Sequence, residues 1–142
     1  MKFSVVICTR NPQQHVIQKT LNCLGEQTLP FNEWELIIVD NDSDQPLAND
    51  LDIPPQLNAI HCSEKTRGLT FARLTGIQHA KAEIVVFVDD DNWLFPDYLE
   101  SAWEKSKLMP ALGTWGGQLI GEFETPHLNG QNATGTGWLC GN

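Results

Sequence analysis

The stretch Glu-Ile-Val-Val-Phe-Val-Asp-Asp-Asp-Asn at residues 83–92 joins an apolar strand directly to three consecutive carboxylates. Residues Ile84 to Val88 are apolar and mostly β-branched, a pattern typical of a short strand covered on both faces of a parallel sheet. In open α/β sheets, ligands bind beyond the carboxyl ends of the strands. The junction between Val88 and Asp89 therefore predicts both a fold class and the edge of the sheet where a site would lie.

Two earlier stretches repeat this pattern of an apolar strand followed by a polar loop. Residues 3–8 (Phe-Ser-Val-Val-Ile-Cys) are followed by Thr9-Arg10-Asn11, and residues 34–39 (Trp-Glu-Leu-Ile-Ile-Val) by Asp40-Asn41-Asp42. Weaker strands are expected over 58–62 and near 114–120. Parallel strands would bring the three polar loops to one edge, although they are far apart in the sequence.

Helical patterns separate the strands. Asn11 followed by Pro12 is typical of an N-cap and a first helical position, and this helix is expected to end near Gly25. A second helix is expected to begin at Gly68, and its packed face would consist of Leu69, Ala72, Gly76, Ile77 and Ala80. A third is expected from Pro96-Asp97, with Leu99, Ala102 and Trp103 facing inward. This alternation predicts an α/β fold with a mostly parallel sheet flanked by helices.

Length and charge limit the classes of partner. The chain has 142 residues, 41% of them hydrophobic, which is enough for one globular core. Acidic residues outnumber basic ones by 18 to 9, for a formal charge of −9. Bare nucleic acid and anionic membranes both demand a basic face, so we predict no nucleic-acid partner. An anionic ligand would need a cation to mediate its binding.

The cysteines favour a reducing compartment. Cys8, Cys23, Cys62 and Cys140 form no CxxC pair and no Cys/His ladder, so no structural zinc site is expected. Cys8 lies in an apolar run and is expected to be a small buried hydrophobe. No secretory signal is apparent, and no apolar stretch reaches the roughly 18 residues that a membrane span needs. We expect a cytoplasmic protein, either free or at the cytosolic face of a membrane.

The acidic run predicts a metal site. Adjacent carboxylates repel one another, and a divalent cation relieves that repulsion; oxygen ligands suit Mg²⁺ or Mn²⁺. In an extended segment, Asp89 and Asp91 would point to the same side and address one ion. The alternative is a solvated acidic loop or a cap for the next helix. The position after a buried strand, beside a second acidic loop, favours the metal.

Two further residues have open alternatives. Asp40, at the end of a strand, could accept N–H groups from the edge of a nucleobase, or it could form an Asx turn within its own loop. Arg73 could pair with the acidic loop or with a diphosphate, and a surface or structural role is equally compatible with its position.

Four blocks in order resemble the N-terminal, nucleotide-sugar-binding portion of a family-2-type glycosyltransferase with the Rossmann-like GT-A fold. The blocks are Ser-Val-Val-Ile-Cys-Thr-Arg-Asn, Trp-Glu-Leu-Ile-Ile-Val-Asp-Asn-Asp-Ser, Arg67-Gly68-Leu69 with Ala72-Arg73 and Gly76, and residues 83–92 followed by Pro96-Asp97-Tyr98-Leu99. The resemblance covers residues 3 to 121. It implies a metal-dependent, inverting transfer of sugar from a nucleotide-diphospho-sugar, usually a UDP-sugar, to the hydroxyl of a saccharide or lipid-linked acceptor.

The resemblance also implies roles for individual residues. Thr9 and Arg10 would contact the nucleotide, Asp40 the base, and Arg73 the region between the nucleotide and the acidic loop. Asp89 and Asp90 would lie near the ribose and the sugar. Mn²⁺ or Mg²⁺ would be held by Asp91 together with Asp89, and as a Lewis acid it would neutralise the leaving diphosphate.

One expected part is missing from the pattern. The family's catalytic base is an Asp or Glu well downstream of the acidic run, and here Glu122 and Glu124 are the only carboxylates beyond Glu104. Neither lies in a base motif, so the base is unassigned. We therefore expect residues 1–128 to form a donor-binding part of a longer GT-A domain, and the glycine-rich residues 129–142 to be a loop or a cut end.

Other classes fit less well. Phosphatases that use an Asp-x-Asp nucleophile require a small residue at the position of Trp93. Calcium loops require a glycine and a Glu at the twelfth position, and this run has neither. A non-catalytic nucleotide-sugar-binding module remains the alternative, since it would keep the donor edge and need no base.

Overall fold

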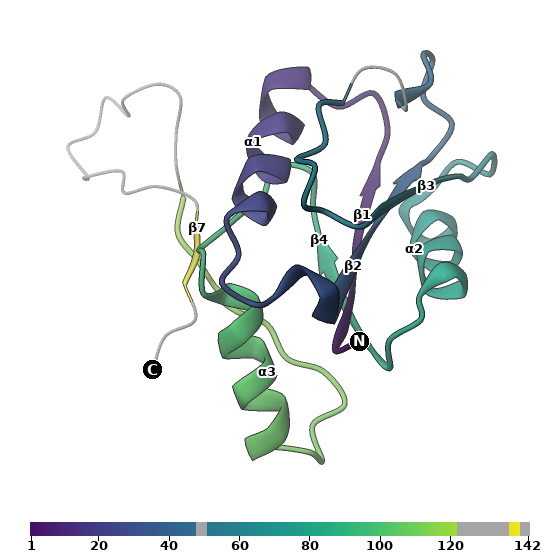
Figure 1. The fold of residues 1–142 in the computed structure, drawn as a ribbon. Coiled ribbons are helices and arrows are strands. Elements are labelled where there is room, and N and C mark those ends of the chain that lie inside the picture. The colour runs from purple at the N-terminus through teal and green to yellow at the C-terminus, as the bar shows by residue number, and fades with distance from the viewer. Residues whose placement is uncertain (48–50, 122–136, 140–142) are drawn as a thin grey trace, which may run out of the picture.

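A four-stranded parallel sheet forms the centre of the computed structural model, which describes residues 1–47 and 51–121 and the backbone of 137–139 (Figure 1). The strand order is β3-β2-β1-β4, with each neighbouring pair parallel. The strands are β1 (Phe3–Thr9), β2 (Trp34–Asp40), β3 (Ala59–Ser63) and β4 (Ile84–Val88). The predicted α/β fold with a mostly parallel sheet is confirmed, and the bounds of these strands agree with the prediction to within one residue.

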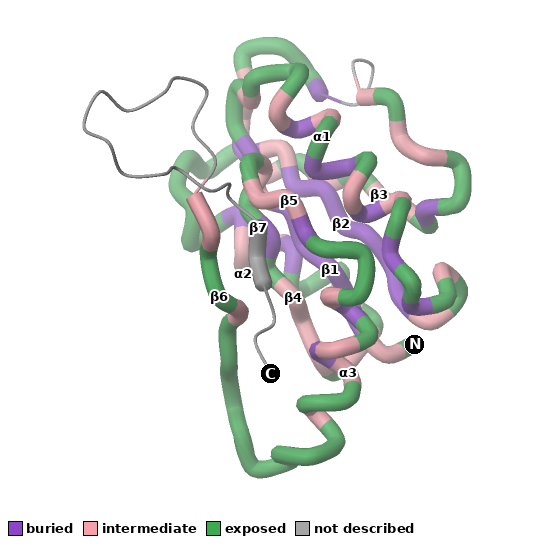
Figure 2. The backbone as a smooth tube through the Cα atoms, turned by 90° about the vertical axis from the view of Figure 1, so that its left-hand side faces the viewer, coloured by how far each residue is buried: buried purple, intermediate pink, exposed green. Residues whose placement is uncertain are grey.

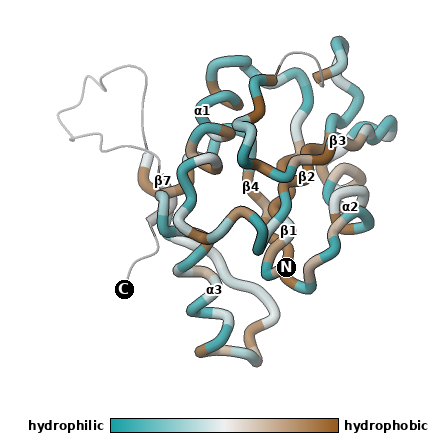
Figure 3. The backbone as a smooth tube through the Cα atoms, viewed as in Figure 1, coloured by the Kyte–Doolittle hydropathy of each residue, from teal (hydrophilic) through white to brown (hydrophobic). Residues whose placement is uncertain are grey.

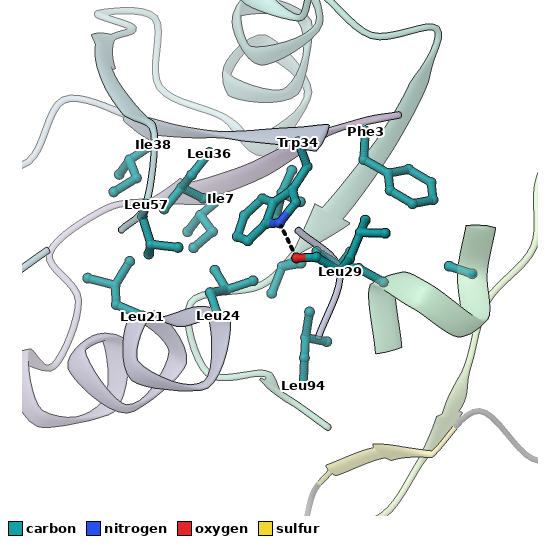
Figure 4. Packing of buried hydrophobic residues seen from close by; sticks show 14 residues of the cluster. Phe3, Ile7, Leu21, Leu24, Leu29, Trp34, Leu36, Ile38, Leu57 and Leu94 are labelled. Atoms are coloured by element: carbon teal, nitrogen blue, oxygen red, sulfur yellow. Dashed lines mark hydrogen bonds between the residues drawn. The ribbon is translucent and has the colours of Figure 1, made fainter. Parts of the chain in front are cut away.

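Helices cover both faces of the sheet. They are α1 (Gln14–Gly25), α2 (Leu69–His79) and α3 (Tyr98–Leu108), and a short 3₁₀ turn, η1 (Phe31–Glu33), precedes β2. Side chains alternate between the faces: Phe3, Val5 and Ile7 join the cluster under α1 and α3, while Val6 joins the cluster under α2. Figure 4 shows the first cluster, where the Trp34 indole N–H donates to the Leu29 carbonyl at 3.3 Å.

The two middle strands are the most apolar and the most buried (Figures 2 and 3). β4 was expected to be covered on both faces, and this is wrong for the described residues. β4 forms an edge of the sheet, only Val88 in it is fully buried, and Phe87 is 40% exposed. An apolar run predicts a strand, but the run itself does not state the strand's place in the sheet.

A second, small sheet has the order β5-β7-β6, formed by β5 (Trp93–Leu94), β6 (Gln118–Leu119) and β7 (Gly137–Leu139). The strand predicted near 114–120 is therefore shorter than expected and lies outside the main sheet. Residues 129–142 were expected to be loop or a cut end, but β7 lies within them; the rest of that stretch, including Cys140, is outside the described residues, as are Glu122 and Glu124. β7 is held by pairing with strands far away in the sequence, which its own glycine-rich composition does not reveal.

None of the helices in the described residues combines the length and the apolarity that a membrane crossing requires. Cys8 is half-buried rather than fully buried, on the face covered by α2. Burial raises the pKa of the Cys8 thiol to about 11, against a lowering effect of Arg73. The thiol therefore stays protonated near neutral pH.

α3 packs as predicted, with Leu99 and Ala102 buried and Trp103 set edge-on against Phe3 at 6.1 Å between ring centroids. The predicted face of α2 is only partly correct. Ala72 and Gly76 are buried, but Leu69 and Ile77 are 50% and 46% exposed. Apolar residues lie on every side of α2, mixed with polar ones, so the sequence pattern alone did not identify its inner face.

Gly76 sets how closely α2 approaches the sheet. A Cβ at this position would lie 2.4 Å from Cγ1 of Val6, which is fully buried in β1. Only glycine lets the helix lie at this distance, because any side chain would push α2 away from β1.

We predict that Gly76→Ala lowers the free energy of unfolding by about 1–3 kcal/mol, the usual cost of overpacking a core. Urea denaturation would measure it. Gly113→Ala is the control, because an added Cβ there meets nothing within 4 Å. The double variant Gly76→Ala, Val6→Ala should lose less stability than the two single changes together, and strict additivity would contradict the proposed clash.

A buried carboxylate fastens the opposite, amino-terminal end of the sheet. Glu35 in β2 is 1% exposed; its Oε1 accepts from Ser4 Oγ at 2.8 Å and from the Lys81 N–H at 2.8 Å, and its Oε2 lies 3.1 Å from Lys81 Nζ. Ser4 Oγ in turn accepts from the N–H groups of Lys81 and Ala82. The turn between α2 and β4 is thereby attached to β1 and β2.

This arrangement predicts a loss of stability in acid. Burial alone would raise the pKa of Glu35, but the hydrogen bonds from the Lys81 N–H and Ser4, with the Lys81 ammonium, outweigh it and lower the pKa below 4.5. The ionised form is therefore favoured in the folded state, and its contribution is complete above about pH 4.5 and lost as the pH falls through the folded-state pKa. Glu35→Gln should cost about 1–2 kcal/mol at pH 7 and flatten the acid limb of stability against pH. An unchanged acid limb would contradict the role of Glu35.

Candidate functional site

The structure brings three polar loops to the carboxyl ends of β1, β2 and β4. Thr9 pairs with Asp40 across β1 and β2, and Ile7 pairs with Val88 across β1 and β4. Asp89 and Asp90 therefore follow Val88 beside the end of β1. The loops after the first, second and fourth strands are neighbours at one edge, which we call the carboxyl edge.

Asp90 is held by the protein at two points. Its carboxylate accepts a hydrogen bond from Thr9 Oγ1, and its carbonyl accepts one from Thr20 Oγ1 of α1 at 2.8 Å. Burial raises the pKa of Asp90 and its neighbours Asp89 and Asp91 raise it further, while the Thr9 hydroxyl opposes them. Asp90 thus faces inward, and the two flanking carboxylates are the exposed ones.

Asp89 and Asp91 do not lie in an extended segment, and that part of the prediction is wrong. The Asn92 N–H donates to the Asp89 carbonyl at 3.0 Å and closes a turn over residues 89–92. The alternation of an extended strand therefore does not place the two side chains on a common side. Both remain exposed at the carboxyl edge, one on each side of the anchored Asp90.

Arg73 lies beside the acidic loop, as one of its two proposed roles requires. Its Nη2 is 3.6 Å from Asp89 Oδ1, and its guanidinium lies over the Phe87 ring at 5.2 Å from the centroid. Both side chains of the ion pair are partly exposed, at 41% and 58%, so the pair contributes little stability and can exchange partners.

Asp40 forms the turn within its own loop, which was one of the two roles predicted for it. Its Oδ1 accepts from the Ser43 N–H at 3.0 Å and its Oδ2 from the Leu47 N–H at 3.4 Å. A carboxylate offers about four lone pairs, so these two bonds orient Asp40 without using all of its accepting capacity.

Asn11 joins the first two loops and is not a helix cap. α1 begins at Gln14, with Gln13 as its N-cap, and Asn11 has φ +50°. The Asn11 N–H donates to Ser43 Oγ at 2.9 Å, and its side-chain amide exchanges bonds of 3.0 and 2.8 Å with Asp44. The predicted cap is wrong because Asp44, in the next loop, binds the Asn11 side chain.

Arg10 supports the same junction between the two loops. Its side chain donates to the Asp42 carbonyl at 3.2 Å and lies 3.6 Å from the Asp44 carboxylate.

Asn41 is a residue that the sequence reasoning missed. It is buried; its Nδ2 donates to the carbonyls of Glu64 and Thr66 at 3.0 and 2.8 Å, and its Oδ1 accepts from the Gly68 N–H at 2.8 Å. These bonds place the loop that carries Arg67, whose Nε reaches Asp42 at 2.6 Å. The available signal was an amide between two acids, since an amide side chain both donates and accepts, whereas the ionised carboxylates beside it only accept.

The charges at the carboxyl edge suit a cation whose coordination is completed by oxygen atoms of a bound ligand. Three guanidinium groups face six carboxylates there: Arg10, Arg67 and Arg73 against Asp40, Asp42, Asp44, Asp89, Asp90 and Asp91. Within the part of the chain described, no group of three or more His, Cys, Asp or Glu side chains forms a ready metal cage. Magnesium-type sites often use one or two carboxylates plus phosphate oxygens, and exposed Asp89 and Asp91 fit that kind of site.

A cavity of about 470 Å³ lies elsewhere, along the edge of β4 against α3 and residues 109–116. Phe87, Tyr98 and Trp115 are among the residues that line it. The acidic run Asp89-Asp90-Asp91 does not line it.

Comparisons with known proteins show the family and the fold of the chain. The family described as Glycosyl transferase family 2 matches residues 4–133 of the chain. A glucosyl-dolichyl phosphate glucuronosyltransferase of Haloferax volcanii is 25% identical over 126 residues, which make up 87% of this chain and 40% of that protein.

Two solved structures have a similar fold. The crystal structure of Staphylococcus aureus TarS 1-349 in complex with UDP matches with a TM-score of 0.70 and 28% identity, over 84% of this chain and 39% of that one. The mannosyltransferase PcManGT from Pyrobaculum calidifontis, in complex with GDP-Man and Mn²⁺, matches with a TM-score of 0.65 and 26% identity, over 82% and 34%. The chain therefore spans less than half the length of each of these proteins.

We predict that Asn41→Ala loosens the 64–68 loop and lowers the free energy of unfolding by about 1–3 kcal/mol, because buried backbone groups lose their partners. Limited trypsin digestion should then cut faster after Lys65 and Arg67. Asn58→Ala is the matched control, since Asn58 is exposed and only its carbonyl is used, as an acceptor from Leu36. Equal cleavage in the two variants would contradict the role assigned to Asn41.

Proposed function

This chain belongs to glycosyltransferase family 2 and has the GT-A fold, and on that premise we propose that it forms the donor-binding part of a metal-dependent, inverting sugar transfer. The donor would be a nucleotide-diphospho-sugar, with UDP as the nucleotide. The acceptor would be the hydroxyl of a saccharide or a lipid-linked glycan.

The contact between Thr9 and Asp90 carries this proposal. It joins loops that are 81 residues apart in the sequence. The loop that would meet the nucleotide and the loop that would meet the metal and the sugar thereby become one surface. Thr9 and Arg10 would face the nucleotide, and Asp89 and Asp90 would lie near the ribose and the sugar.

Oxygen ligands from Asp91 and Asp89 would hold Mn²⁺ or Mg²⁺, which when bound supplies a Lewis acid for the leaving diphosphate. The chain's own cations would share that task. Arg73, only 3.6 Å from Asp89 in a partly exposed pair, would turn toward a phosphate oxygen of the donor. Without a cation, six carboxylates would repel an anionic donor.

Asp40 would distinguish the base. Its turn bonds to Ser43 and Leu47 fix the carboxylate at the end of β2 and leave lone pairs for a nucleobase N–H. The two similar structures carry different nucleotides, UDP in TarS and GDP-Man in PcManGT, so the choice of uridine is part of the proposal.

A non-catalytic nucleotide-sugar-binding module is the second candidate. Such a module would keep the donor edge and would need no catalytic base. Both candidates place the donor on the same surface. We propose that this surface belongs to a unit over residues 1–128 of a cytoplasmic protein; among the described residues, Cys8, Cys23 and Cys62 form no disulfide.

We predict that UDP binds about tenfold more tightly or better with Mn²⁺ than without it, and that Asp91→Ala removes that gain, because the exposed carboxylate is a proposed ligand. Titration calorimetry with UDP and with GDP would measure both the metal effect and the base preference. Asp52→Ala is the charge-matched control, since Asp52 is exposed and, among the described residues, its hydrogen bonds go to Gln18 of α1 rather than to the three loops. UDP binding of equal strength with and without metal would contradict the metal assignment.

A further inference from the structure

The segment that carries and follows the acidic run is fastened to α1 and to the residues just after it. Thr20 Oγ1 donates to the Asp90 carbonyl at 2.8 Å, and Gln27 Nε2 donates to the Phe95 carbonyl at 2.8 Å. The Thr28 N–H donates to the Pro96 carbonyl, also at 2.8 Å. These bonds cross about 70 residues of sequence, so they report tertiary placement rather than local turn geometry.

Both anchoring side chains are buried. Thr20 is 0% and Gln27 4% exposed, so water is poorly placed to replace them. Gln27 uses both ends of its amide, because its Oε1 also accepts from the Leu99 N–H at 3.1 Å. The first N–H groups of a helix lack partners within the helix, and Asp97, the N-cap of α3, makes no side-chain cap. Gln27 therefore fixes the start of α3 as well as the end of the acidic segment.

Asp90 is held from two directions. Thr9, at the end of β1, binds its carboxylate, and Thr20, in the helix that follows, binds its carbonyl. β1 and α1 are consecutive elements, and together they hold Asp90 through these two hydrogen bonds. The same two bonds set the positions of Asp89 and Asp91, its immediate neighbours.

We propose that Thr20 and Gln27 are positioning residues for the metal ligands. They touch neither the donor nor the ion, and they fix where Asp89 and Asp91 present their oxygens. Groups that orient metal ligands in this way commonly change metal affinity by about 10- to 100-fold when removed. This assignment rests on the proposed function and extends it to two residues outside the carboxyl edge.

The test compares paired variants of the full chain. Thr20→Val removes the hydroxyl at nearly constant shape, and Thr20→Ser keeps it. Gln27→Leu is matched by Gln18→Leu in α1, because Gln18 also bonds a distant backbone through both ends of its amide, to Asp52 O at 2.7 Å and from Asp52 N at 3.1 Å. Mn²⁺ binding is followed from the free-ion electron paramagnetic resonance signal in saturating UDP, and UDP binding is measured separately without metal.

Thr20→Val and Gln27→Leu should weaken Mn²⁺ binding by about 10- to 100-fold and leave metal-free UDP binding unchanged. Thr20→Ser and Gln18→Leu should bind Mn²⁺ like the parent. If Thr20→Val melts at a lower temperature but binds Mn²⁺ normally, Thr20 is only structural and the inference is overturned. Equal losses in Gln27→Leu and Gln18→Leu would overturn it for Gln27.

Two further outcomes are decisive. If Gln27→Leu does not fold, the Thr20→Val and Thr20→Ser pair decides the inference, since those changes alter a single hydroxyl or methyl group. If the unmutated chain shows no Mn²⁺-dependent UDP binding, the metal-dependent function fails and this inference fails with it. A normal parent with an unaffected Thr20→Val overturns the inference alone.

Discussion

β1 is hydrogen-bonded along both edges and covered on both faces, and the candidate site is attached to it directly or through one neighbour. Its parallel pairing with β2 and β4 brings their carboxyl ends together. Gly76 lets α2 approach Val6 on one face, and Phe3, Val5 and Ile7 pack on the other. The site is therefore positioned by burial of a single strand.

The carboxyl edge combines an inward-facing acid with exposed ones. Thr9 and Thr20 hold Asp90 from two directions, and desolvation raises the pKa of its carboxyl while the Thr9 hydroxyl opposes that rise. Asp89 and Asp91 remain exposed, and Asp89 forms a weak, exchangeable pair with the Arg73 guanidinium. Such an edge gains from a bound cation and an anionic partner together more than from either alone.

Much of the fold could be predicted from the sequence, but few of the hydrogen bonds that build the site could. The strands at 3–8, 34–39 and 84–88 follow from short, mostly apolar runs that are rich in β-branched residues. The predicted cap at Asn11 failed because its amide pairs with Asp44, 33 residues away, and local capping statistics do not contain that partner. The extended reading of the acidic run failed because the Asn92 N–H closes a turn. Asn41, Thr20 and Gln27 were missed because their partners lie 23 to 72 residues away.

The sequence by itself determined the strands, the alternation with helices, and the placing of acids and arginines at strand ends, because these depend on local periodicity and residue type. It also determined the family, through four blocks in a fixed order. Only the tertiary structure decided that Asp90 turns inward to Thr9, that Asp40 bonds its own loop, and that α1 holds the acidic segment. Those outcomes depend on which backbone and side-chain groups meet across long separations, and the geometry of the buried sheet sets that.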